Sequence, residues 1–406
     1  MQFFAFAGVV RPYTAAAFTQ ATSMSLRIFI PIEADPRETR IAMVPEVAGK
    51  LSKAGIEVRI QAGLGRRLGW ADALYEAAGA KVEAGPAAGY GEADMVLRVT
   101  PTAVEEVKVL RRGCVHVSHL DPFGQPSLVR ALAEAGITAV SMEMMPRTTV
   151  AQKMDALSSQ ANLAGYVAVL LAAERSDKIF PMMSTPAGTI APARVLVIGA
   201  GVAGLQAIAT AKRLGAVVEA FDTRPVVEEQ VRSLGARFIK VDLGETGQTK
   251  DGYAKALTEE QLARQREALA RTCASADVVI TTAKVFGRKA PVIVTDEMLS
   301  GMGQGSVVVD LAVEAGGNVA GSVAGEEREV HGVRVLGLTN LAGRVPLAAS
   351  QVYASNLGNF VLHFWDKAKS EFNLDLQHEI LRGCVLTHQG RIIHDNARTA
   401  QEALKG

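Results

Sequence analysis

The sequence predicts an α/β protein with two Rossmann-like, doubly wound parallel-sheet domains, separated by a cleft and joined by two long helices. Three observations lead to this fold class. A chain of 406 residues is too long for one ordinary hydrophobic core. Two series of β-like runs alternate with helix-like stretches, which is typical of parallel sheets with crossover helices. The second series opens with a glycine-rich turn directly after a β-like run, as in dinucleotide-binding domains.

The first domain is expected to comprise residues 24–150 and 348–406. Its strands are predicted at 27–31, 57–61, 95–99, 114–118 and 137–141, and its helices at 45–54, 72–78, 103–110 and 125–135. Residues 1–23 are interpreted as an extension outside the fold, because Arg11 and Pro12 follow the apolar run MQFFAFAGVV and a second start is present at Met24.

The second domain is expected to cover residues 151–347. Its strands are predicted near 194 and at 217–221, 237–241, 278–282, 307–311 and 333–338, with helices at 227–234, 259–273 and 296–300. One connecting helix is predicted at 148–175 and the other at 348–369, after which a hairpin at 383–393 should return to the first domain. The ligand cleft is then expected outside the carboxyl ends of the strands.

Composition excludes several classes of function. The chain has 43 basic and 42 acidic residues, so no charge excess favours nucleic acid or a membrane surface. Cys114, Cys273 and Cys384 match no metal or redox spacing and are expected to be buried in a reducing compartment. The most apolar helical stretch, near 166–173, is shorter than the roughly twenty residues that a membrane span needs, so the chain alone is expected to be soluble.

The glycine turn carries a nucleotide fingerprint. Gly199 permits the tight turn, Gly201 lets the backbone approach a diphosphate, and Gly204 lets helix and strand pack closely. Asp222 follows the next strand, 18 residues past the third glycine, where an acid accepts hydrogen bonds from ribose hydroxyls and repels a 2′-phosphate. The cofactor predicted is therefore NAD rather than NADP. Arg224 is the nearby group that could weaken this preference, although we expect it to be solvated.

A long polar loop, 241–254, follows the third strand of this series and is interpreted as a lid or an insertion. Tyr253 on this loop either folds over a bound nucleotide or is a solvated loop aromatic. The predicted cofactor-binding residues are Gly199, Ala200, Gly201, Val202, Ala203, Gly204, Asp222, Thr223, Arg224, Tyr253, Thr281, Thr282, Ala283, Asp310 and Leu311.

A polar stripe precedes the fingerprint. If the chain is helical from Gln152, then Gln152, Asp155 and Ser159 lie on one helix face at i, i+3 and i+7. With Arg147 they could hold a carboxamide-bearing ring at the cleft. These groups suit orientation more than proton transfer at neutral pH. A solvated helix face with a capping residue is the alternative interpretation.

The sequence resembles the NAD(H)-binding component, domain I, of proton-translocating NAD(P) transhydrogenase, over about residues 24–390. The resemblance is carried by MPRTTVAQKMDALSSQANLAGY (145–166), the fingerprint segment (194–218), DGYAKAL (251–257) and SVVVDLAVEAGGN (306–318). It implies that Arg147, Gln152, Asp155 and Ser158 surround the nicotinamide, with Gln152 at the hydride-transfer face, and that Tyr253 lies on a loop closing over NAD(H).

The resemblance also implies how the protein is assembled. The expected assembly is a homodimer that donates hydride from NADH directly to NADP⁺ held on domain III of a partner (beta) subunit. A membrane subunit then couples the reaction to protons, which places the complex peripherally on the cytoplasmic face of the inner (plasma) membrane. Direct transfer between two nicotinamides needs proximity and exclusion of water, so no metal, acid or base is expected.

Alanine dehydrogenase is the related family that competes with this interpretation. It holds an oxo-acid with an arginine and a lysine and uses a histidine and an aspartate, for which the matching positions here are Arg40, Arg98, His119 and Asp310. Arginine at position 98 cannot replace a lysine's point charge or give up its proton. Ile32 replaces a common lysine, and the loop at 341–343 also departs from the usual Pro-Ser form. No small oxo-acid substrate is therefore expected, although an alanine dehydrogenase-like activity stays the alternative.

Overall fold

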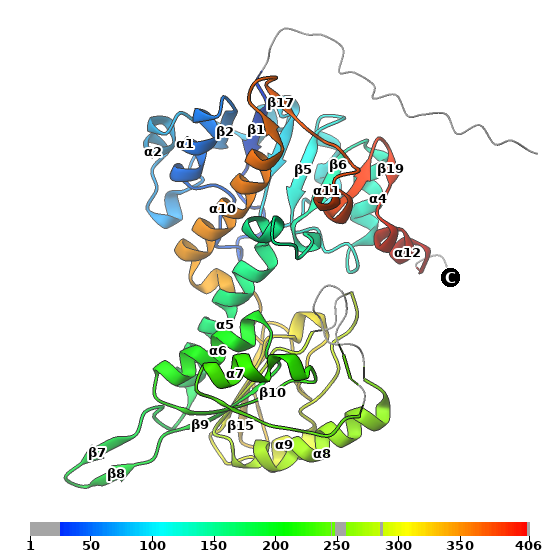
Figure 1. Cartoon of the computed structure of the whole chain (residues 1–406). Helices are drawn as coiled ribbons and strands as arrows, with labels where there is room; N and C mark the ends of the chain where they lie inside the picture. Colours follow the sequence, from blue (N-terminus) through cyan, green and yellow to red (C-terminus); the bar gives the residue numbers. More distant parts are fainter. Residues whose placement is uncertain (1–24, 245, 248–256, 285–286, 404–406) are drawn as a thin grey trace, which may run out of the picture.

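The computed structural model describes residues 25–244, 246–247, 257–284 and 287–403. The N-terminal extension and Tyr253 lie outside the described residues, so the predictions made for them are not tested. The described chain forms two lobes, each built around its own sheet, and helices α5 (Ala156–Arg175) and α10 (Pro346–Phe364) run between the lobes (Figure 1).

The sheet of the N-terminal lobe has the strand order β19-β18-β6-β5-β4-β1-β2-β3. Strands β1 to β6 are parallel, whereas β18 pairs antiparallel with β6. The C-terminal hairpin therefore completes the N-terminal sheet. The strands are β1 (Arg27–Ile30), β2 (Glu57–Gln61), β3 (Lys81–Glu83), β4 (Met95–Leu97), β5 (Val115–Ser118), β6 (Thr138–Ser141), β18 (Val385–His388) and β19 (Arg391–Ile392).

The helices of this lobe are α1 (Pro45–Lys53), α2 (Asp72–Ala77), α3 (Pro86–Glu92), α4 (Pro126–Glu134), α11 (Glu379–Cys384) and α12 (Asp395–Ala403). The helix predicted at 103–110 is a 3₁₀ helix, Val104–Val109. Helix α10 ends in a short hairpin, β16 (Trp365–Asp366) and β17 (Glu371–Phe372), earlier than predicted.

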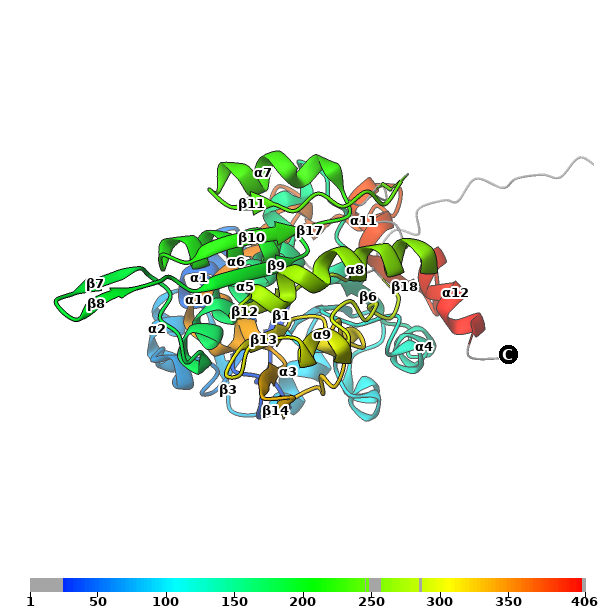
Figure 2. The same ribbon diagram turned by 90° about the horizontal axis from the view of Figure 1, so that it is seen from below.

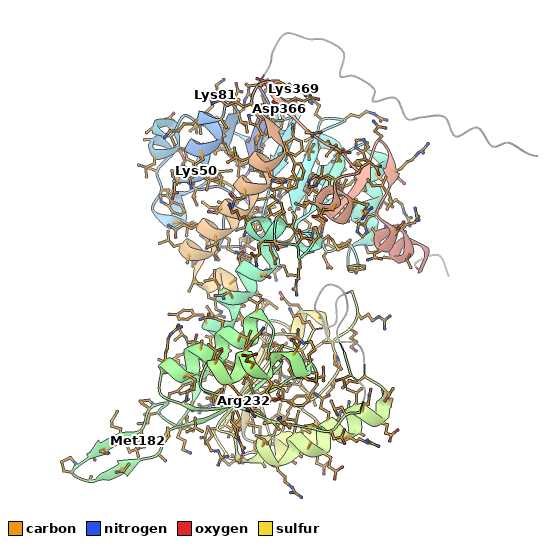
Figure 3. The ribbon with its side chains drawn as sticks, viewed as in Figure 1. Lys50, Lys81, Met182, Arg232, Asp366 and Lys369 are labelled. Atoms are coloured by element: carbon orange, nitrogen blue, oxygen red, sulfur yellow. The ribbon has the colours of Figure 1, made fainter. Side chains whose placement is uncertain are left out.

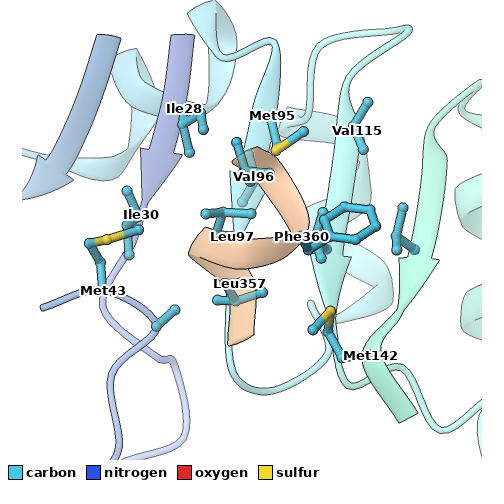
Figure 4. Close-up of a cluster of buried hydrophobic side chains, with 14 of the residues drawn as sticks. Ile28, Ile30, Met43, Met95, Val96, Leu97, Val115, Met142, Leu357 and Phe360 are labelled. Atoms are coloured by element: carbon cyan, nitrogen blue, oxygen red, sulfur yellow. The ribbon is translucent and has the colours of Figure 1, made fainter. Parts of the chain in front are cut away.

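Helix α10 supplies much of the core of the N-terminal lobe. Leu357 and Phe360 are fully buried, and Figure 4 shows them over the sheet near Val96 and Leu97. Burying each such side chain stabilises the fold by roughly 1.5–3 kcal/mol. The C-terminal segment thus holds the N-terminal lobe together through its helix as well as its strands.

The sheet of the C-terminal lobe has the order β11-β10-β9-β12-β13-β15-β14, and it is parallel except for β14 (Figure 2). Alternation along β9 directs Val195 and Val197 into one core and Leu196 and Ile198 into the other. The strands are β9 (Arg194–Ile198), β10 (Val217–Phe221), β11 (Arg237–Phe238), β12 (Val278–Thr281), β13 (Val307–Asp310), β14 (Glu327–Val330) and β15 (Val333–Leu336).

Helices cover both faces of this sheet. Residues of α5 and α6 (Val202–Arg213) share one core, and residues of α8 (Glu259–Ser275) and α9 (Asp296–Ser300) share the other, while α7 (Glu228–Ser233) packs near α6. A doubly wound sheet of this kind places its strand ends at one edge. The predicted α/β class is confirmed in both lobes.

The first connecting segment is not one helix from 148 to 175. A 3₁₀ helix, Ala151–Met154, ends at Asp155, whose ψ of 84° breaks the helical path before α5 begins. Gln152 and Asp155 therefore do not share a helix face with Ser159, and that prediction was wrong. Asp155 instead caps α5, accepting a hydrogen bond from the Ser158 N–H at 2.8 Å.

Among the residues that the structure describes, α5, with 20 residues, is the one helix that is long and apolar enough to cross a membrane. The expectation that its apolar stretch is too short was therefore wrong. Part of its apolar surface packs inside the protein, where α5 contacts α6, α10 and β13, whereas Tyr166 and Leu170 are each 38% exposed. A Cβ at Gly165 would lie 2.1 Å from the Ala203 carbonyl oxygen, so α5 and α6 touch backbone to backbone.

A hairpin that was not predicted projects from the C-terminal lobe (Figure 1). Its strands are β7 (Met183–Thr185) and β8 (Gly188–Ile190), and every residue in them is exposed. Met182, labelled in Figure 3, leaves 66% of its surface exposed. The three cysteines are free and buried, as predicted.

Candidate functional site

A cavity of about 370 Å³ lies at the carboxyl ends of the C-terminal strands and extends to the start of α5. This volume is within the range of nucleotide and cofactor pockets. Its lining residues are Arg147, Leu157, Ser158, Ala161, Ala164, Ile198, Gly199, Gly201, Val202, Ala203, Phe221, Asp222, Thr223, Arg224, Leu257, Leu262, Gln265, Thr282, Ala283, Lys284, Arg288, Lys289, Pro291, Ile293, Leu311, Glu314, Leu338, Asn340 and Leu341.

The glycine turn has the geometry that its sequence requires. Gly199 has a φ of 99°, which side-chain-bearing residues rarely adopt. A Cβ at Gly204 would lie 1.8 Å from the Gly199 carbonyl oxygen, so only glycine allows α6 to start this close to β9. A Cβ at Gly201, by contrast, would meet nothing within 4 Å.

The open space beside Gly201 fits a diphosphate. Gly201 is the N-cap of α6, and no described side chain caps this helix end. The first N–H groups of a helix and its dipole favour an anion at this position. The main-chain N–H groups of the turn can therefore donate hydrogen bonds to the diphosphate. Because Gly201 has no side chain, the diphosphate can approach this main chain closely.

Asp222 lies at the end of β10 on the pocket wall. Its Oδ2 accepts a hydrogen bond from the Ala200 N–H at 2.7 Å, which ties the acid to the glycine turn. Arg224 grips the same carboxylate through Nε at 2.9 Å and Nη2 at 2.8 Å. The expectation that Arg224 is solvated was wrong, because its side chain is only 13% exposed. Its hydrogen bond to Asp222 raises the pKa of Arg224.

The strand-end predictions divide into two groups. Thr282, Ala283 and Leu311 line the cavity. Thr281 and Asp310 are fully buried and outside the lining, and the Thr281 hydroxyl donates to Asp310 at 3.1 Å. Their side chains shape the wall from behind rather than face the cavity.

The remaining fingerprint predictions divide in the same way. Val202, Ala203 and Thr223 line the cavity with Gly199 and Gly201, whereas Ala200 and Gly204 are packed against the turn.

The four candidates for the nicotinamide end are also placed unequally. Arg147 and Ser158 line the cavity, but Gln152 and Asp155 are outside its lining. Asp155 accepts both the N–H and the hydroxyl of Ser158, at 2.8 and 2.5 Å, so it fixes the orientation of that hydroxyl. Gln152 is exposed on the 3₁₀ helix just before the break.

Several lining residues were missed by sequence reasoning. Asn340 adopts a left-handed φ of 47°, caps the 3₁₀ helix Leu341–Arg344 and lines the cavity. An asparagine just after a strand is a usable signal for such a conformation. Lys284, Arg288 and Lys289 bring three cations to the cavity lining, and no short motif marks them.

The N-terminal lobe neutralises the cations that could bind an oxo-acid. Arg40 pairs with Glu38 at 2.7 Å, and their side chains are 12% and 4% exposed. Arg98, only 1% exposed, pairs with Glu33 at 3.4 Å and Glu106 at 3.0 Å.

The pKa values of these groups follow from burial and pairing. Burial raises the pKa of Glu38, but the hydrogen bonds and the charge of Arg40, together with a hydrogen bond from Asn340, leave the pKa lowered overall. His119 Nδ1 lies 3.6 Å from Glu143 Oε2. Burial also raises the pKa of Glu143, yet interactions with His119 and Ser141 lower it overall. Burial and then the charge of Arg98 lower the pKa of His116 to about 3.

Among the residues that the structure describes, no group of three or more histidine, cysteine, aspartate or glutamate side chains could hold a metal ion.

Comparison with known proteins agrees with this geometry. Residues 29–164 match the family model for the alanine dehydrogenase/PNT N-terminal domain, and residues 168–395 match the C-terminal domain. An alpha-subunit chain of the NAD(P) transhydrogenase of Rhodospirillum rubrum is 45% identical over 93% of this chain and 100% of its own length.

A solved structure and a more distant relative extend the comparison. The crystal structure of transhydrogenase from Sinorhizobium meliloti is 46% identical, with a TM-score of 0.81 over 90% of this chain and 99% of that one. Alanine dehydrogenase of Halomonas elongata is 30% identical over 87% of this chain and 91% of its own length. Identity is thus higher on the transhydrogenase side. The chain belongs to the alanine dehydrogenase/PNT family, among the NAD(P) transhydrogenase alpha subunits.

Proposed function

We propose that this chain binds NADH and lets its hydride pass directly to NADP⁺ held on domain III of a partner subunit. The observation that carries this proposal is the open α-carbon of Gly201 at the uncapped start of α6, beside Asp222. This arrangement supports a diphosphate at the helix end and a ribose against the acid. Bound NADH supplies the hydride, and the protein supplies binding and orientation.

The adenosine end would be held at Asp222. A ribose has to share this carboxylate with Arg224 and the Ala200 N–H, or displace the guanidinium. The two oxygens of Asp222 already accept four hydrogen bonds, one from the Ala200 N–H and three from Arg224, so a ribose hydroxyl has to replace or share one of them. Asp222 repels the 2′-phosphate of NADP(H), which supports NAD(H) as the nucleotide of this chain. NADP(H) would then bind on the partner.

The nicotinamide end would be held near the start of α5. Ser158, fixed by Asp155, and Arg147 offer a hydroxyl and a guanidinium to a carboxamide. Gln152 is proposed at the side where the acceptor ring arrives, consistent with its exposed position. Direct transfer requires the two rings to be adjacent and water to be excluded, and this places no demand for a proton donor on these residues.

We further propose a homodimer that docks peripherally on a membrane subunit at the cytoplasmic face of the membrane, where that subunit couples hydride transfer to proton movement. The exposed apolar side chains of the β7–β8 hairpin and its base support self-association. Ile179, Met182, Met183 and Ile190 are each at least 36% exposed. Sedimentation should find a dimer, and a clean monomer would contradict this aspect of the proposal.

An alanine dehydrogenase-like activity is the second candidate, because a relative of that name is 30% identical. The buried pairs Arg40–Glu38 and Arg98–Glu33 argue against it. An oxo-acid carboxylate would have to displace an internal carboxylate already in contact, and removing one partner of a buried pair is costly.

One assay separates the candidates. The proposed function expects NADH-dependent reduction of an NADP⁺ analogue only after a domain III protein is added. Ammonia-dependent oxidation of NADH by pyruvate would support the alternative, and NADH binding with neither activity would leave a nucleotide-sensing role.

Replacing Gln152 with Asn tests the nicotinamide end. Shortening an exposed side chain beside the acceptor should slow hydride transfer about tenfold or more and change NADH affinity little. Stopped-flow transfer rates and NADH titrations measure the two effects. The matched control is Gln304→Asn, remote from the cavity and bonded only at the surface. Equal losses of rate and affinity in Gln152→Asn would contradict its placement.

A further inference from the structure

The turn after β13, residues 312–318, ends in a fully buried asparagine. The Asn318 side chain makes three hydrogen bonds, which use its carbonyl oxygen and both N–H groups. Its Oδ1 accepts the Ala283 N–H at 2.9 Å, and its Nδ2 donates to the carbonyl oxygens of Ala283 at 2.9 Å and Pro291 at 2.8 Å. No part of this side chain reaches the cavity.

The main chain of Asn318 extends the same network. Its N–H donates to Asp310 Oδ2 at 2.9 Å, and its carbonyl oxygen accepts the N–H groups of Ile293 and Val294 at 2.8 and 3.0 Å. Asn318 thus links Asp310, at the end of β13, to Ala283 at the start of segment 283–293 and to Pro291 and Ile293 at its end.

This segment forms the cationic wall of the cavity, defined as Ala283, Lys284, Arg288, Lys289, Pro291 and Ile293. The turn lies directly beneath the wall. The Ala290 N–H donates to Ala315 at 2.7 Å, and a Cβ at Gly316 would lie 2.5 Å from the Lys289 Cγ. The aliphatic stem of Lys289 therefore lies against Gly316 of the turn.

The wall is also joined to the glycine turn. The residue before Ala283, Thr282, donates its N–H to Ile198 at 2.8 Å and its hydroxyl to Gly199 at 3.0 Å. A shift of Ala283 would therefore move the glycine turn and the cationic wall together. Both surfaces face the same cavity.

We propose that Asn318 is a positioning residue for NAD(H): it holds the cationic wall at the distance that a diphosphate bound at α6 requires. The identity of the ligand rests on the proposed function. Among side chains of this size, only an amide offers one acceptor and two donors together. Aspartate keeps the acceptor but loses both donors, and leucine loses all three groups.

The test compares Asn318→Leu and the milder Asn318→Ser with the wild type. NADH affinity is measured by titration at several salt concentrations, together with hydride transfer at saturating NADH and the thermal midpoint. We expect Asn318→Leu to weaken NADH binding roughly tenfold, because misplaced cations lose part of their attraction to the diphosphate. The salt dependence of binding should become shallower, while transfer at saturating NADH changes less than twofold.

The matched control is Thr387→Val in the N-terminal lobe. The Thr387 hydroxyl is fully buried and makes two hydrogen bonds to main chain, at 2.7 and 3.1 Å, far from the cavity. It should lower the thermal midpoint without changing NADH affinity or its salt dependence.

Two results are kept apart by this design. If Asn318→Leu, or Asn318→Ser where the leucine variant does not fold, lowers the thermal midpoint but binds NADH as the wild type does, the positioning role is overturned. If the wild type itself does not bind NADH, the proposed function has failed instead.

Discussion

The two lobes have similar sheets, but the carboxyl edges of those sheets carry opposite chemistry. After β9, β10 and β12 of the C-terminal sheet come a glycine turn, Asp222 and Thr282, around an open cavity. After β1, β4 and β5 of the N-terminal sheet come Glu33, Arg98 and His119: Glu33 and Arg98 form a buried ion pair, and His119 Nδ1 lies 3.6 Å from a carboxylate oxygen of Glu143. The same architecture therefore holds a ligand site at one edge and a self-neutralised core at the other. Function depends on the residues that follow the strands rather than on the fold.

The largest expected effect comes from breaking the N-terminal pairs. Replacing Glu33 with Ala leaves Arg98, which is 1% exposed, with one carboxylate partner fewer. The Val99 N–H, which donates to Glu33 at 2.6 Å, also loses its acceptor. We expect the free energy of unfolding to fall by about 3 kcal/mol or more, since a buried charge and a buried donor lose partners. Denaturant titration measures it.

Glu33→Ala should lower the stability of the protein without changing its affinity for NADH. Because Glu33 is remote from the cavity lining, NADH affinity of the folded protein should stay within about twofold. A loss of NADH affinity that exceeds the loss of stability would show that the lobes are not independent. Asp35→Ala, at an exposed pair on the same loop, is the control and should change stability little.

The next largest effect is expected from a substitution that fills the cavity beside the start of α6. Gly201→Val places a branched side chain where no atom lies within 4 Å, and the φ of −79° suits any residue. The fold should persist, while the diphosphate loses its approach to the helix end. We expect NADH affinity to fall about a hundredfold, measured by titration.

Gly91→Val in the N-terminal lobe is the matched control, because a Cβ there also meets nothing within 4 Å. It should leave NADH affinity unchanged and change stability by less than about 1 kcal/mol, because Gly91 lies in helix α3, where valine is no less favourable than glycine. Unchanged NADH binding in Gly201→Val would contradict the proposal that the diphosphate binds beside Gly201.

At neutral pH the smallest effect comes from His116 in the N-terminal lobe, whose influence on stability emerges only as the pH falls. Burial holds the pKa of His116 at about 3, below its ordinary value of 6.5. The unfolded chain binds a proton below pH 6.5 that the folded chain refuses until about pH 3. Stability is therefore fully present above pH 6.5 and falls as the pH drops through this window, by at most about 1.4 kcal/mol per pH unit.

His116→Leu should make the free energy of unfolding less dependent on pH in this window. Denaturant titrations at roughly pH 4 to 7 measure this dependence. His331→Asn, at an exposed position with a left-handed φ of 53°, should leave it unchanged. An unaltered slope in His116→Leu would assign the acid sensitivity to the buried carboxylate pairs.

The sequence was sufficient where local chemistry determines structure. The run after Val195 predicted both the strand and the glycine geometry, because Gly199 and Gly204 satisfy steric requirements that no other residue meets. Edge elements were harder. Strand β3 has three residues with one exposed, and the β7–β8 hairpin is exposed throughout, so neither has the apolar alternation that a pattern detects.

The site shows the same limit. The interval from Gln152 to Ser159 fits a helix by spacing, but Asp155 prefers to cap the next helix and interrupts it. Arg224 was expected in solvent, yet a carboxylate two residues away in the chain gives its fork a bidentate partner. Lys284 lies at the cavity, and Asn318 bonds to Ala283 and Pro291, which are 35 and 27 residues away in the sequence; neither placement follows from local sequence patterns.

The close approach of Gly165 to Ala203 determines which regions of the protein can turn against each other. Because their backbones touch, α5 and α6 form one stiff body with the glycine turn. Any swing of the lobes has to bend the chain where helical dihedrals are lost, at Asp155 and at Val345. Ser158 would then travel with the nucleotide, and Arg147, on the other side of the bend, would be drawn away from it. The two side chains proposed to contact the nicotinamide, Ser158 and Arg147, would therefore reach it together only when the lobes are closed.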